Sequence, residues 1–414
     1  MSKKNSNKCS FCGKPKEDVK ILISGLDGFI CENCVSQAKE IVDAEVAHTV
    51  NKPTNLSTPT KNLKPKTIKE YLDKYVIGQD EAKKVIAVAV YNHYKRLNQK
   101  IQEDEVEIEK SNILVVGQTG TGKTLIAKSI AKLLNVPFAI VDATIFTEAG
   151  YVGEDVESIL TRLLQVCNYD TALAEKGIVY IDEIDKIARK GDNPSLTRDI
   201  KEGTQQSLLK LIEGTEVLVP PNGGRKHPEQ KMLKVDTKNI LFICGGSFDG
   251  INNNIAKRLG TSIVGFKKAM DGNHEVDKEN LLNYITPQDI KSFGLIPELI
   301  GRLPVLSYLE PLDKDALSAI LSQPKNALIK QYKKLFAVEN IEFEMDTDAI
   351  DFIVEKALEY KLGARGLRSI CEAIINDAMY ELPSQTEVKK FVVTRAYAEE
   401  QLNKSKITDK LRVA

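Results

Sequence analysis

Residues 111–134 read SNILVVGQTGTGKTLIAKSIAKLL and carry the strongest structural signal of the chain. The apolar run ILVV predicts a buried strand, and the isoleucines and leucines after the glycines recur at helical spacing. The loop between them matches GxxxxGK[ST], whose glycines let backbone N–H groups surround nucleotide phosphates. Lys123 should reach the terminal phosphates, and Thr124 should place its hydroxyl on magnesium. The nucleotide-binding residues expected here are Gln118, Thr119, Gly120, Thr121, Gly122, Lys123, Thr124 and Leu125.

A second apolar run, IVYI at 178–181, leads directly into two carboxylates, Asp182 and Glu183. Beside a phosphate-binding loop, the first acid would orient the metal and the second would polarise an attacking water. A solvated acidic turn is the alternative reading. Together the two motifs predict nucleotide hydrolysis rather than storage.

The apolar runs predict the fold class. Between residues 67 and 310 they alternate with helical patterns, which favours an α/β module with a parallel sheet flanked by helices. After Pro311 the pattern is mostly helical, and KKFVVTRA at 389–396 suggests a short strand in a small α+β domain. The expected strands are ILVV at 113–116, FAIV at 138–141, IVYI at 178–181, ILFIC at 240–244 and LPVLSYL at 303–309.

The length of the chain suggests several domains, because 414 residues are more than a single hydrophobic core usually supports. Residues 48–66 are rich in Pro, Thr, Asn and Lys, which is typical of a flexible linker. The expected parts are a zinc-binding N-terminal domain at 1–47, the linker at 48–66, a large ATPase domain at 67–311, a small domain at 312–398 and a tail at 399–414.

Four cysteines near the start have the spacing of a metal site. They form two Cys-x-x-Cys pairs around KILISGLDGFI, which predicts a hairpin. A pair of disulfides is the alternative, but the basic start leads into no apolar signal segment, so a cytoplasmic protein with reduced thiols is expected. A closed, structural zinc site follows, with the ligands Cys9, Cys12, Cys31 and Cys34.

The net charge limits the classes of partner. Lys plus Arg and Asp plus Glu number 58 each, so the formal charge is zero. A neutral chain is a poor candidate for a partner held by long-range charge, such as nucleic acid or an anionic membrane, and no run has the length of a membrane span. The sequence contains neither HExxH nor GxSxG, so any peptide cleavage would need a separate peptidase.

The order of several motifs along the chain carries a family resemblance. The four-cysteine head, YVIGQ at 75–79, GQTGTGKT, GYVG, IDEIDKIA, LIGRLPV and GARGLRS together resemble the AAA+ ATPases, and more narrowly the ClpX unfoldases of the bacterial Clp protease. The resemblance covers nearly the whole chain. It implies a homohexameric, ATP-dependent unfoldase that takes protein substrates and adaptors and threads substrates into a ClpP-type peptidase.

The same resemblance implies roles for residues around the nucleotide. Val76 and Ile77 would line the adenine pocket. Arg302 looks like the arginine finger that reaches the nucleotide of a neighbouring subunit, and Arg365 looks like the sensor arginine of the small domain. For either arginine, a surface ion pair is the alternative. The polar sensor after Cys244-Gly245-Gly246 is unassigned, with Ser247 as a weak candidate.

Substrate and peptidase contacts are also implied by the resemblance. Tyr151 and Val152, between two pivoting glycines, would form an apolar paddle in the pore, although packing within their own subunit is the alternative. Two polar loops, 191–204 and 220–230, would face the same channel, and the second carries Arg225, Lys226 and His227, which could also be a solvated basic turn. Where the family has Ile-Gly-Phe or Leu-Gly-Phe for docking, this chain has Val264, Gly265 and Phe266.

Two other functions remain open at this point. One is a nucleic-acid-remodelling AAA+ ATPase, such as a helicase loader, whose zinc domain contacts DNA. The other is an HslU-type unfoldase, which has the same engine but lacks the four-cysteine head. The neutral charge and the GYVG segment weigh against the first alternative.

Overall fold

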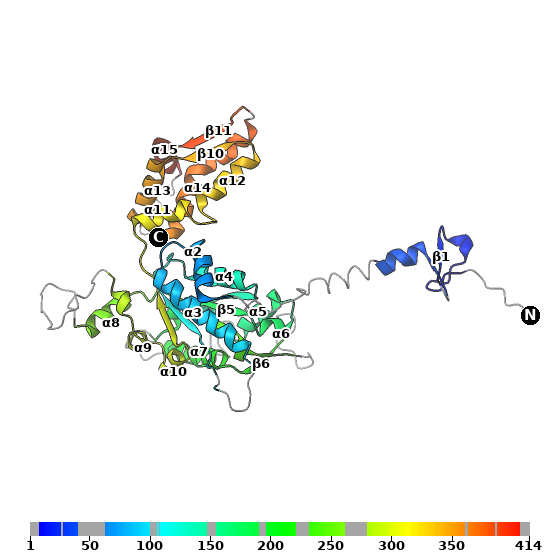
Figure 1. Cartoon of the computed structure of the whole chain (residues 1–414), viewed down its shortest axis with the longest axis horizontal. Coiled ribbons are helices and arrows are strands. Elements are labelled where there is room, and N and C mark those ends of the chain that lie inside the picture. The colour runs from blue at the N-terminus through cyan, green and yellow to red at the C-terminus, as the bar shows by residue number, and fades with distance from the viewer. Residues whose placement is uncertain are drawn as a thin grey trace, which may run out of the picture. The chain divides into compact units, whose positions relative to one another are not determined.

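The computed structural model divides into two units, Met1–Pro59 and Thr60–Ala414. Figure 1 labels the elements of both units. The described residues are 8–25, 28–39, 63–99, 106, 108–146, 155–189, 196–220, 232–260, 280–360, 363–385 and 387–405, without the side chains of 196–200.

The first unit contains the expected hairpin. Strands β1 (Leu22–Ser24) and β2 (Phe29–Cys31) pair antiparallel, with Leu22 opposite Cys31. A short 3-10 turn, η1 (Lys16–Asp18), precedes the hairpin, and residues 32–39 are helical. Strand β2 lies beside the first Cys-x-x-Cys pair, because the N–H of Ser10 donates to Phe29 O (2.7 Å) and the N–H of Cys31 donates to Cys9 Sγ (3.3 Å).

The second unit is built on a five-stranded sheet in the order β4-β5-β8-β3-β9, in which every neighbouring pair is parallel. All five strands that the apolar runs predict are present, but two of them begin later than expected: β8 by one residue and β9 by two. The strands are β3 (Ile113–Val116), β4 (Phe138–Asp142), β5 (Ile178–Asp182), β8 (Leu241–Gly246) and β9 (Val305–Tyr308).

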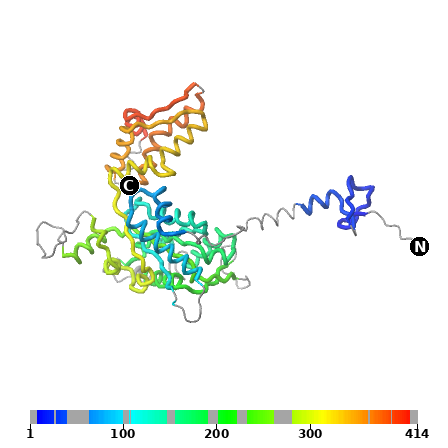
Figure 2. The backbone as a smooth tube through the Cα atoms, viewed as in Figure 1, coloured from blue at the N-terminus to red at the C-terminus, as the bar shows by residue number. Residues whose placement is uncertain are grey.

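Helices cover both faces of this sheet, as Figure 1 and the backbone trace in Figure 2 show. Alternate residues of each central strand enter opposite cores: Leu114 and Val116 lie in one, and Ile113 and Val115 in the other. Because both faces are buried, the strands read as continuous apolar runs. The second of these cores packs on α2 (Pro65–Asp73), α3 (Asp80–Leu97) and α4 (Lys123–Leu134). The first packs on α5 (Ser158–Val166), α6 (Thr171–Ala174), α7 (Leu196–Glu213), α8 (Ile251–Arg258), α9 (Pro287–Phe293) and α10 (Pro297–Gly301).

Two features of this unit differ from the sequence predictions. The prediction of a loop at 191–204 is wrong for residues 196–204, because these residues form the start of helix α7. Polar composition suggested exposure, but the polar residue Gln205 of the same helix is fully buried: its Nε2 donates to Ile187 O (2.9 Å), and its Oε1 accepts from the N–H of Ile296 (2.8 Å). The second difference is an unpredicted antiparallel hairpin, β6 (Glu216–Val219) with β7 (Leu233–Asp236).

Helix α2 begins at Pro65, one residue before the expected end of the linker. Proline suits the first turn of a helix, because its missing N–H would have no intrahelical partner there. Short 3-10 turns, which mostly join the larger elements, are η3 (Ala143–Ile145), η4 (Ile184–Ile187), η5 (Thr237–Asn239), η6 (Leu281–Tyr284) and η7 (Leu382–Ser384).

The small domain has its own core of aromatic and aliphatic side chains, in which the rings of Phe336 and Phe343 stack with centroids 5.1 Å apart. The expected strand at its end is present as β11 (Lys390–Val393), and it pairs parallel with an unpredicted strand, β10 (Glu342–Met345). The helices are α11 (Lys314–Ser322), α12 (Leu328–Val338), α13 (Thr347–Glu359), α14 (Gly363–Glu381) and α15 (Arg395–Lys404). The last helix continues past residue 398 and buries Leu402.

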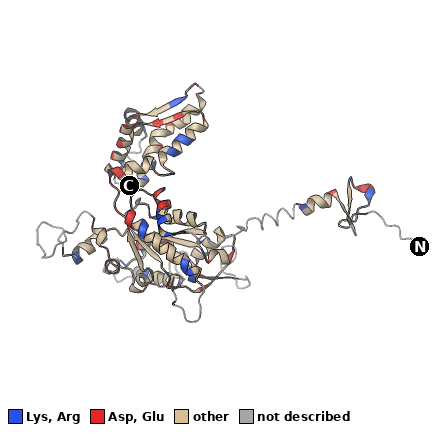
Figure 3. Cartoon of the chain, in the orientation of Figure 1, with Lys and Arg blue, Asp and Glu red and all other residues tan. Residues whose placement is uncertain are grey.

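Charges of both signs occupy the same elements of the second unit, as Figure 3 shows. This mixture agrees with the zero net charge of the sequence. Among the described residues, no helix combines the length and apolar character that crossing a bilayer would require.

Asn112 directly precedes β3, and its side chain bonds to β8 and to the residue that follows α10. Its replacement should therefore destabilise the large domain. Its side chain is 2% exposed, donates to Arg302 O (3.0 Å) and accepts from Phe242 N–H (3.1 Å). The substitution Asn112→Ala leaves both groups unpaired and should cost about 2 kcal/mol. We expect the midpoint of thermal unfolding to fall by roughly 5 °C in differential scanning fluorimetry.

The control is Asn92→Ala, which removes an exposed asparagine from α3. It should leave the midpoint nearly unchanged, and equal midpoints for the two variants would contradict the assigned role of Asn112.

Candidate functional site

A cavity of about 580 Å³ lies at the carboxyl ends of the parallel strands, where the large domain meets the small domain. Ligands of open α/β sheets bind at this edge. Its wall contains most of the expected nucleotide-binding loop, the acidic pair at the end of β5 and Arg365 from the small domain. The structure therefore brings together residues that are separated by more than half of the chain.

The loop after β3 has the backbone that its glycines permit. Gly120 and Gly122 have φ values of 85° and 106°, in the left-handed region that L side chains rarely adopt. Lys123 is nearly buried, and its Nζ donates to the carbonyl oxygens of Gly117 (2.6 Å) and Gln118 (2.9 Å). Burial lowers the pKa of Lys123, while the charges of nearby carboxylates, Asp182 first, raise it. The ammonium group is thus held inside the loop, beside the cavity.

Thr124 and Asp182 connect the two predicted motifs. The Thr124 hydroxyl, at the start of α4, donates to Asp182 Oδ2 at the end of β5 over 3.1 Å. A hydroxyl and a carboxylate oxygen are ligands that Mg²⁺ prefers, and both residues line the cavity. The donor set therefore fits the magnesium ion that the sequence predicts.

Tyr180 is a site residue that the sequence analysis missed. Its fully buried hydroxyl lies 3.3 Å from Asp182 Oδ1, to which the N–H of Glu183 also donates (3.0 Å). Burial raises the pKa of Tyr180, so the hydroxyl stays protonated as a donor. A Cβ atom at Gly245 would lie 2.1 Å from the hydroxyl oxygen, so only glycine leaves room there. The glycine pair at the end of β8 was the signal that could have revealed this contact.

Glu183 is exposed and lines the cavity beside Asp182. Its φ of 55° is unusual for a residue other than glycine, and a strained backbone of this kind is typical of functional positions. The next acid along, Asp185, is buried and accepts hydrogen bonds from Ser247 N–H (3.1 Å) and the Ser247 hydroxyl (3.2 Å). Ser247 lines the cavity, so it stays a candidate for the unassigned sensor.

The small domain contributes the other wall. Helix α14 begins directly over the loop: a Cβ atom at Gly120 would lie 3.3 Å from Ala364 N. Arg365 lines the cavity as expected, and so does Arg368, which the sequence analysis did not single out. Arg368 donates to Gln331 Oε1 over 3.2 Å. Two guanidinium groups of one helix therefore border the space.

Neither of the residues expected around the base is in the described wall, although Val76 lies close to the loop. Val76 is buried, and its Cγ1 would be 3.9 Å from a Cβ atom at Gly122. Ile77 is half-buried. Tyr75 lines the cavity, whereas Val76 and Ile77 are absent from its described lining. Proximity to the loop thus supports the expected adenine role for Val76 alone.

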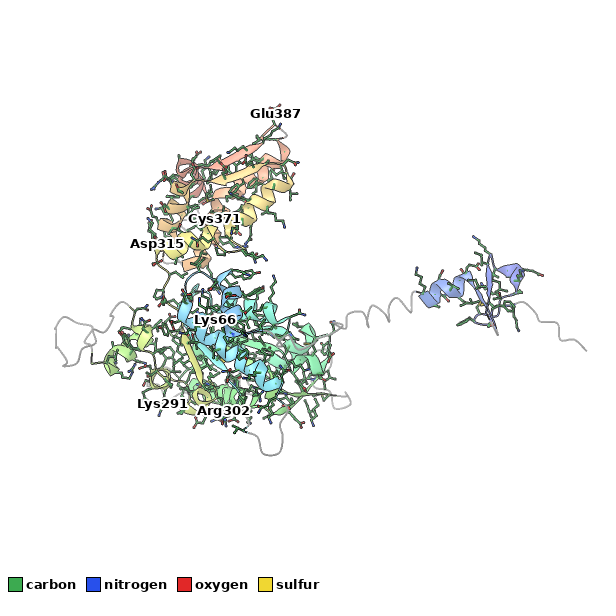
Figure 4. The ribbon with its side chains drawn as sticks, in the orientation of Figure 1. Lys66, Lys291, Arg302, Asp315, Cys371 and Glu387 are labelled. Atoms are coloured by element: carbon green, nitrogen blue, oxygen red, sulfur yellow. The ribbon has the colours of Figure 1, made fainter. Side chains whose placement is uncertain are left out.

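Arg302 lies elsewhere. It follows α10, is 58% exposed and forms an ion pair with Glu213 (2.9 Å), and it is not among the described residues that line the cavity. Figure 4 shows Arg302 on the far side of the large domain from Asp315 and Cys371 of the small domain. Among the described residues, therefore, Arg302 does not meet the candidate residues of the cavity.

The first unit holds the four cysteines together. The Sγ atoms of Cys9, Cys12, Cys31 and Cys34 all lie within 4.8 Å of one another, and those of Cys12 and Cys31 are 3.6 Å apart. Tetrahedral zinc with Zn–S bonds of about 2.3 Å requires sulfur atoms roughly 3.8 Å apart. A hydrogen bond from the backbone N–H of Cys12 lowers the pKa of the Cys9 thiol to about 6, whereas burial raises the pKa of the Cys34 thiol to about 12. The site fits zinc, which must displace the proton of Cys34.

Three groups of predicted residues lie outside the described residues: Tyr151 and Val152, Arg225 to His227, and Val264 to Phe266. Arg225, Lys226 and His227 belong to the connection between β6 and β7, since β6 ends at Val219 and β7 begins at Leu233.

Zinc content should depend on each of the four ligands. The substitution Cys12→Ser replaces an exposed ligand, so we expect zinc to fall from about one ion per chain to nearly none, since three thiolates leave the tetrahedral site incomplete. The measurement is the metal content of the purified full-length chain by inductively coupled plasma mass spectrometry. Cys167→Ser, which alters a cysteine in the core of the large domain, should keep its zinc. A full complement of zinc in Cys12→Ser would contradict the four-cysteine site.

Comparison with known proteins agrees with this arrangement. Residues 7–44 match the ClpX C4-type zinc finger, residues 108–306 the AAA domain (Cdc48 subfamily) and residues 312–395 the C-terminal, D2-small domain, of ClpB protein. Similar relatives are named ATP-dependent Clp protease ATP-binding subunit ClpX. They include proteins of Bacteroides thetaiotaomicron (59% identical over 413 residues, 99% of both chains), Bacteroides fragilis (60% over 408 residues, 98% of both) and Porphyromonas gingivalis (59% over 402 residues, 97% of both). With a zinc site of four cysteines, an ATP-binding AAA domain and a small C-terminal domain, the chain belongs to the ClpX family of AAA ATPases.

Proposed function

We propose that the chain is an ATP-dependent protein unfoldase that works as a homohexamer and threads substrates into a ClpP-type peptidase. The observation that carries the proposal is the single cavity in which Lys123, the Thr124–Asp182 pair and Glu183 face Arg365 of the small domain. The relatives are named as ATP-binding subunits of a protease, and this sequence has no peptidase motif of its own. A separate peptidase would therefore perform the cleavage.

Within the cavity, each residue has a distinct task. Lys123 would place its positive charge against the terminal phosphates. Thr124 and Asp182 would hold magnesium, which supplies positive charge to the phosphate oxygens when bound. Glu183 would orient and deprotonate the attacking water, because it is the exposed carboxylate beside Asp182. Arg365 would report the state of the phosphates to the small domain.

Arg302 would act on the nucleotide of a neighbouring subunit. It is exposed, lies away from the cavity of its own chain and pairs only with Glu213 among the described contacts. An exposed ion pair of this kind is worth less than about 1 kcal/mol, so moving the guanidinium to a phosphate costs little. Hydrolysis would then require assembly, which is the physical advantage of a finger supplied by a neighbour.

The substrate would be gripped by Tyr151 and Val152, which follow β4 and η3 in the sequence. Their grip would depend on bulk rather than on a hydrogen-bonding pattern, so it would suit any extended polypeptide. Arg225, Lys226 and His227 would attract a carboxylate at the pore entrance. Val264, Gly265 and Phe266 would dock on the peptidase, and adaptor proteins would deliver some substrates. We place the protein in the cytoplasm, because a four-thiolate site needs reduced cysteines.

The role of Glu183 can be tested by removing only its charge. We expect Glu183→Gln to bind ATP normally but to hydrolyse it at a rate lower by roughly 100-fold or more, since the general base is lost. Binding would be measured with radiolabelled ATP and turnover by phosphate release. The control Glu81→Gln removes an exposed carboxylate at the start of α3 and should turn over normally. Normal turnover in Glu183→Gln would exclude Glu183 from the mechanism.

The role of Tyr151 can be tested by changing its size. In the presence of a ClpP-type peptidase, we expect Tyr151→Ala to retain ATP hydrolysis but to lose degradation of a folded, tagged fluorescent protein, measured as loss of fluorescence. Tyr151→Phe keeps the bulk of the ring and should keep degradation.

The same assay separates the proposal from nucleic-acid remodelling. Unfolded protein should raise the rate of ATP hydrolysis by the unmodified chain, and DNA should not. Stimulation by DNA that falls steeply with salt, or unimpaired degradation by Tyr151→Ala, would count against the unfoldase.

A further inference from the structure

The turn between α2 and α3 contains an unusual backbone that the proposed function does not explain. Gly78 and Gln79 both have left-handed φ values, 59° and 62°. Glycine adopts this conformation freely, but glutamine does so at a cost. A strained residue persists when surrounding contacts hold it, so the contacts of Gln79 are informative.

The side chain of Gln79 is 5% exposed and pairs with both main-chain groups of one residue far away in the sequence. Its Nε2 donates to Glu310 O over 2.9 Å, and its Oε1 accepts from Glu310 N–H over 2.8 Å. Both bonds have good lengths, and the pairing satisfies the donor and the acceptor of the same residue. The left-handed turn therefore directs a buried amide onto Glu310.

Glu310 lies where the large domain ends. The residue before it, Leu309, donates its N–H to Val116 O at the end of β3 (2.7 Å), and its Cβ lies 2.9 Å from the position of a Cβ atom at Gly117. The residue after it, Pro311, leads to α11 of the small domain. Gln79 thus holds the linker between the domains at the point where that linker touches the phosphate-binding loop.

The other end of the same turn is tied to the small domain. The N–H of Lys325, between α11 and α12, donates to Lys74 O over 2.7 Å. Between the two ties, Tyr75 lines the nucleotide cavity, and Val76 is fixed by a hydrogen bond from Lys83 Nζ to its carbonyl oxygen (3.2 Å). Residues 74–79 therefore touch the cavity, the small domain and the interdomain linker at once.

We propose that Gln79 is a positioning residue that couples nucleotide binding to the interdomain linker, by holding Glu310 against the segment that borders the base. The inference rests on the proposed nucleotide role of this segment. Because such coupling is reciprocal, fixing the linker strengthens nucleotide binding, and bound nucleotide steadies the linker. If Gln79 only stabilised the turn, its replacement would change neither the affinity for nucleotide nor the effect of nucleotide on the linker.

The test is the variant Gln79→Glu in the full-length chain. Glutamate keeps the size and the bond to Glu310 N–H but places a carboxylate oxygen opposite Glu310 O. We expect the dissociation constant of a fluorescent ADP analogue to rise by roughly fivefold or more. In hydrogen–deuterium exchange, saturating ADP should slow exchange at residues 309–313 in the unmodified chain but no longer do so in the variant.

The control is Gln401→Glu, which changes a buried glutamine of α15 in the small domain core. It should lower the thermal midpoint without changing either nucleotide readout. A lowered midpoint in Gln79→Glu with an unchanged dissociation constant and unchanged protection would overturn the coupling and leave a structural role. If ADP fails to protect residues 74–79 even in the unmodified chain, the nucleotide role of the segment is itself wrong, which is a different failure.

Discussion

The hydrogen bond between Thr124 and Asp182 can form only because two strands approach each other across a third. Thr124 follows β3, and Asp182 ends β5, but β8 lies between these strands in the sheet. The end of β8 consists of Gly245 and Gly246, and Cβ atoms there would lie 2.1 Å from the Tyr180 hydroxyl and 2.7 Å from Asp185 Oδ1. Because Gly245 and Gly246 have no side chains, the side chains of Tyr180 and Asp182 can extend across the end of β8 towards the phosphate-binding loop.

The two cores of the sheet and the separate core of the small domain explain where this unit can bend. Leu309 belongs to the second core of the sheet and Leu312 packs against the core of the small domain, so the chain passes from one separate core to another around Pro311. Hydrogen bonds also connect the domains near that point: the Gln79–Glu310 pairing holds the linker, and the N–H of Lys325 donates to Lys74 O. Hydrogen bonds to backbone groups have one favoured geometry but little net free energy, which suits an element that must exchange between positions.

The sequence predicted what depends on burial and missed what depends on distant partners. Strands β3, β4, β5, β8 and β9 were found because apolar runs buried on both faces are hard to mistake. Strand β10 reads Glu-Phe-Glu-Met, a short half-exposed pattern whose partner β11 lies far along the chain. The start of α7 is polar, and its composition is that of a loop. In the site, Lys123, Asp182 and Glu183 were identified by motif, whereas Tyr180 and Gln79 owe their positions to Gly245 and Glu310, which no local pattern connects with them.

The distribution of sulfur gives the two units unequal resistance to oxidants. Cys167, Cys244 and Cys371 are buried in apolar cores, and burial raises the pKa of each thiol to about 12, which keeps them in the unreactive protonated form. The cysteines of the first unit instead hold together a segment with little apolar core of its own. Peroxide or hypochlorite would therefore oxidise the zinc ligands, release the metal and unfold the N-terminal unit while leaving the ATPase core intact. Under oxidative stress the chain would lose its zinc-binding unit before it loses ATP hydrolysis.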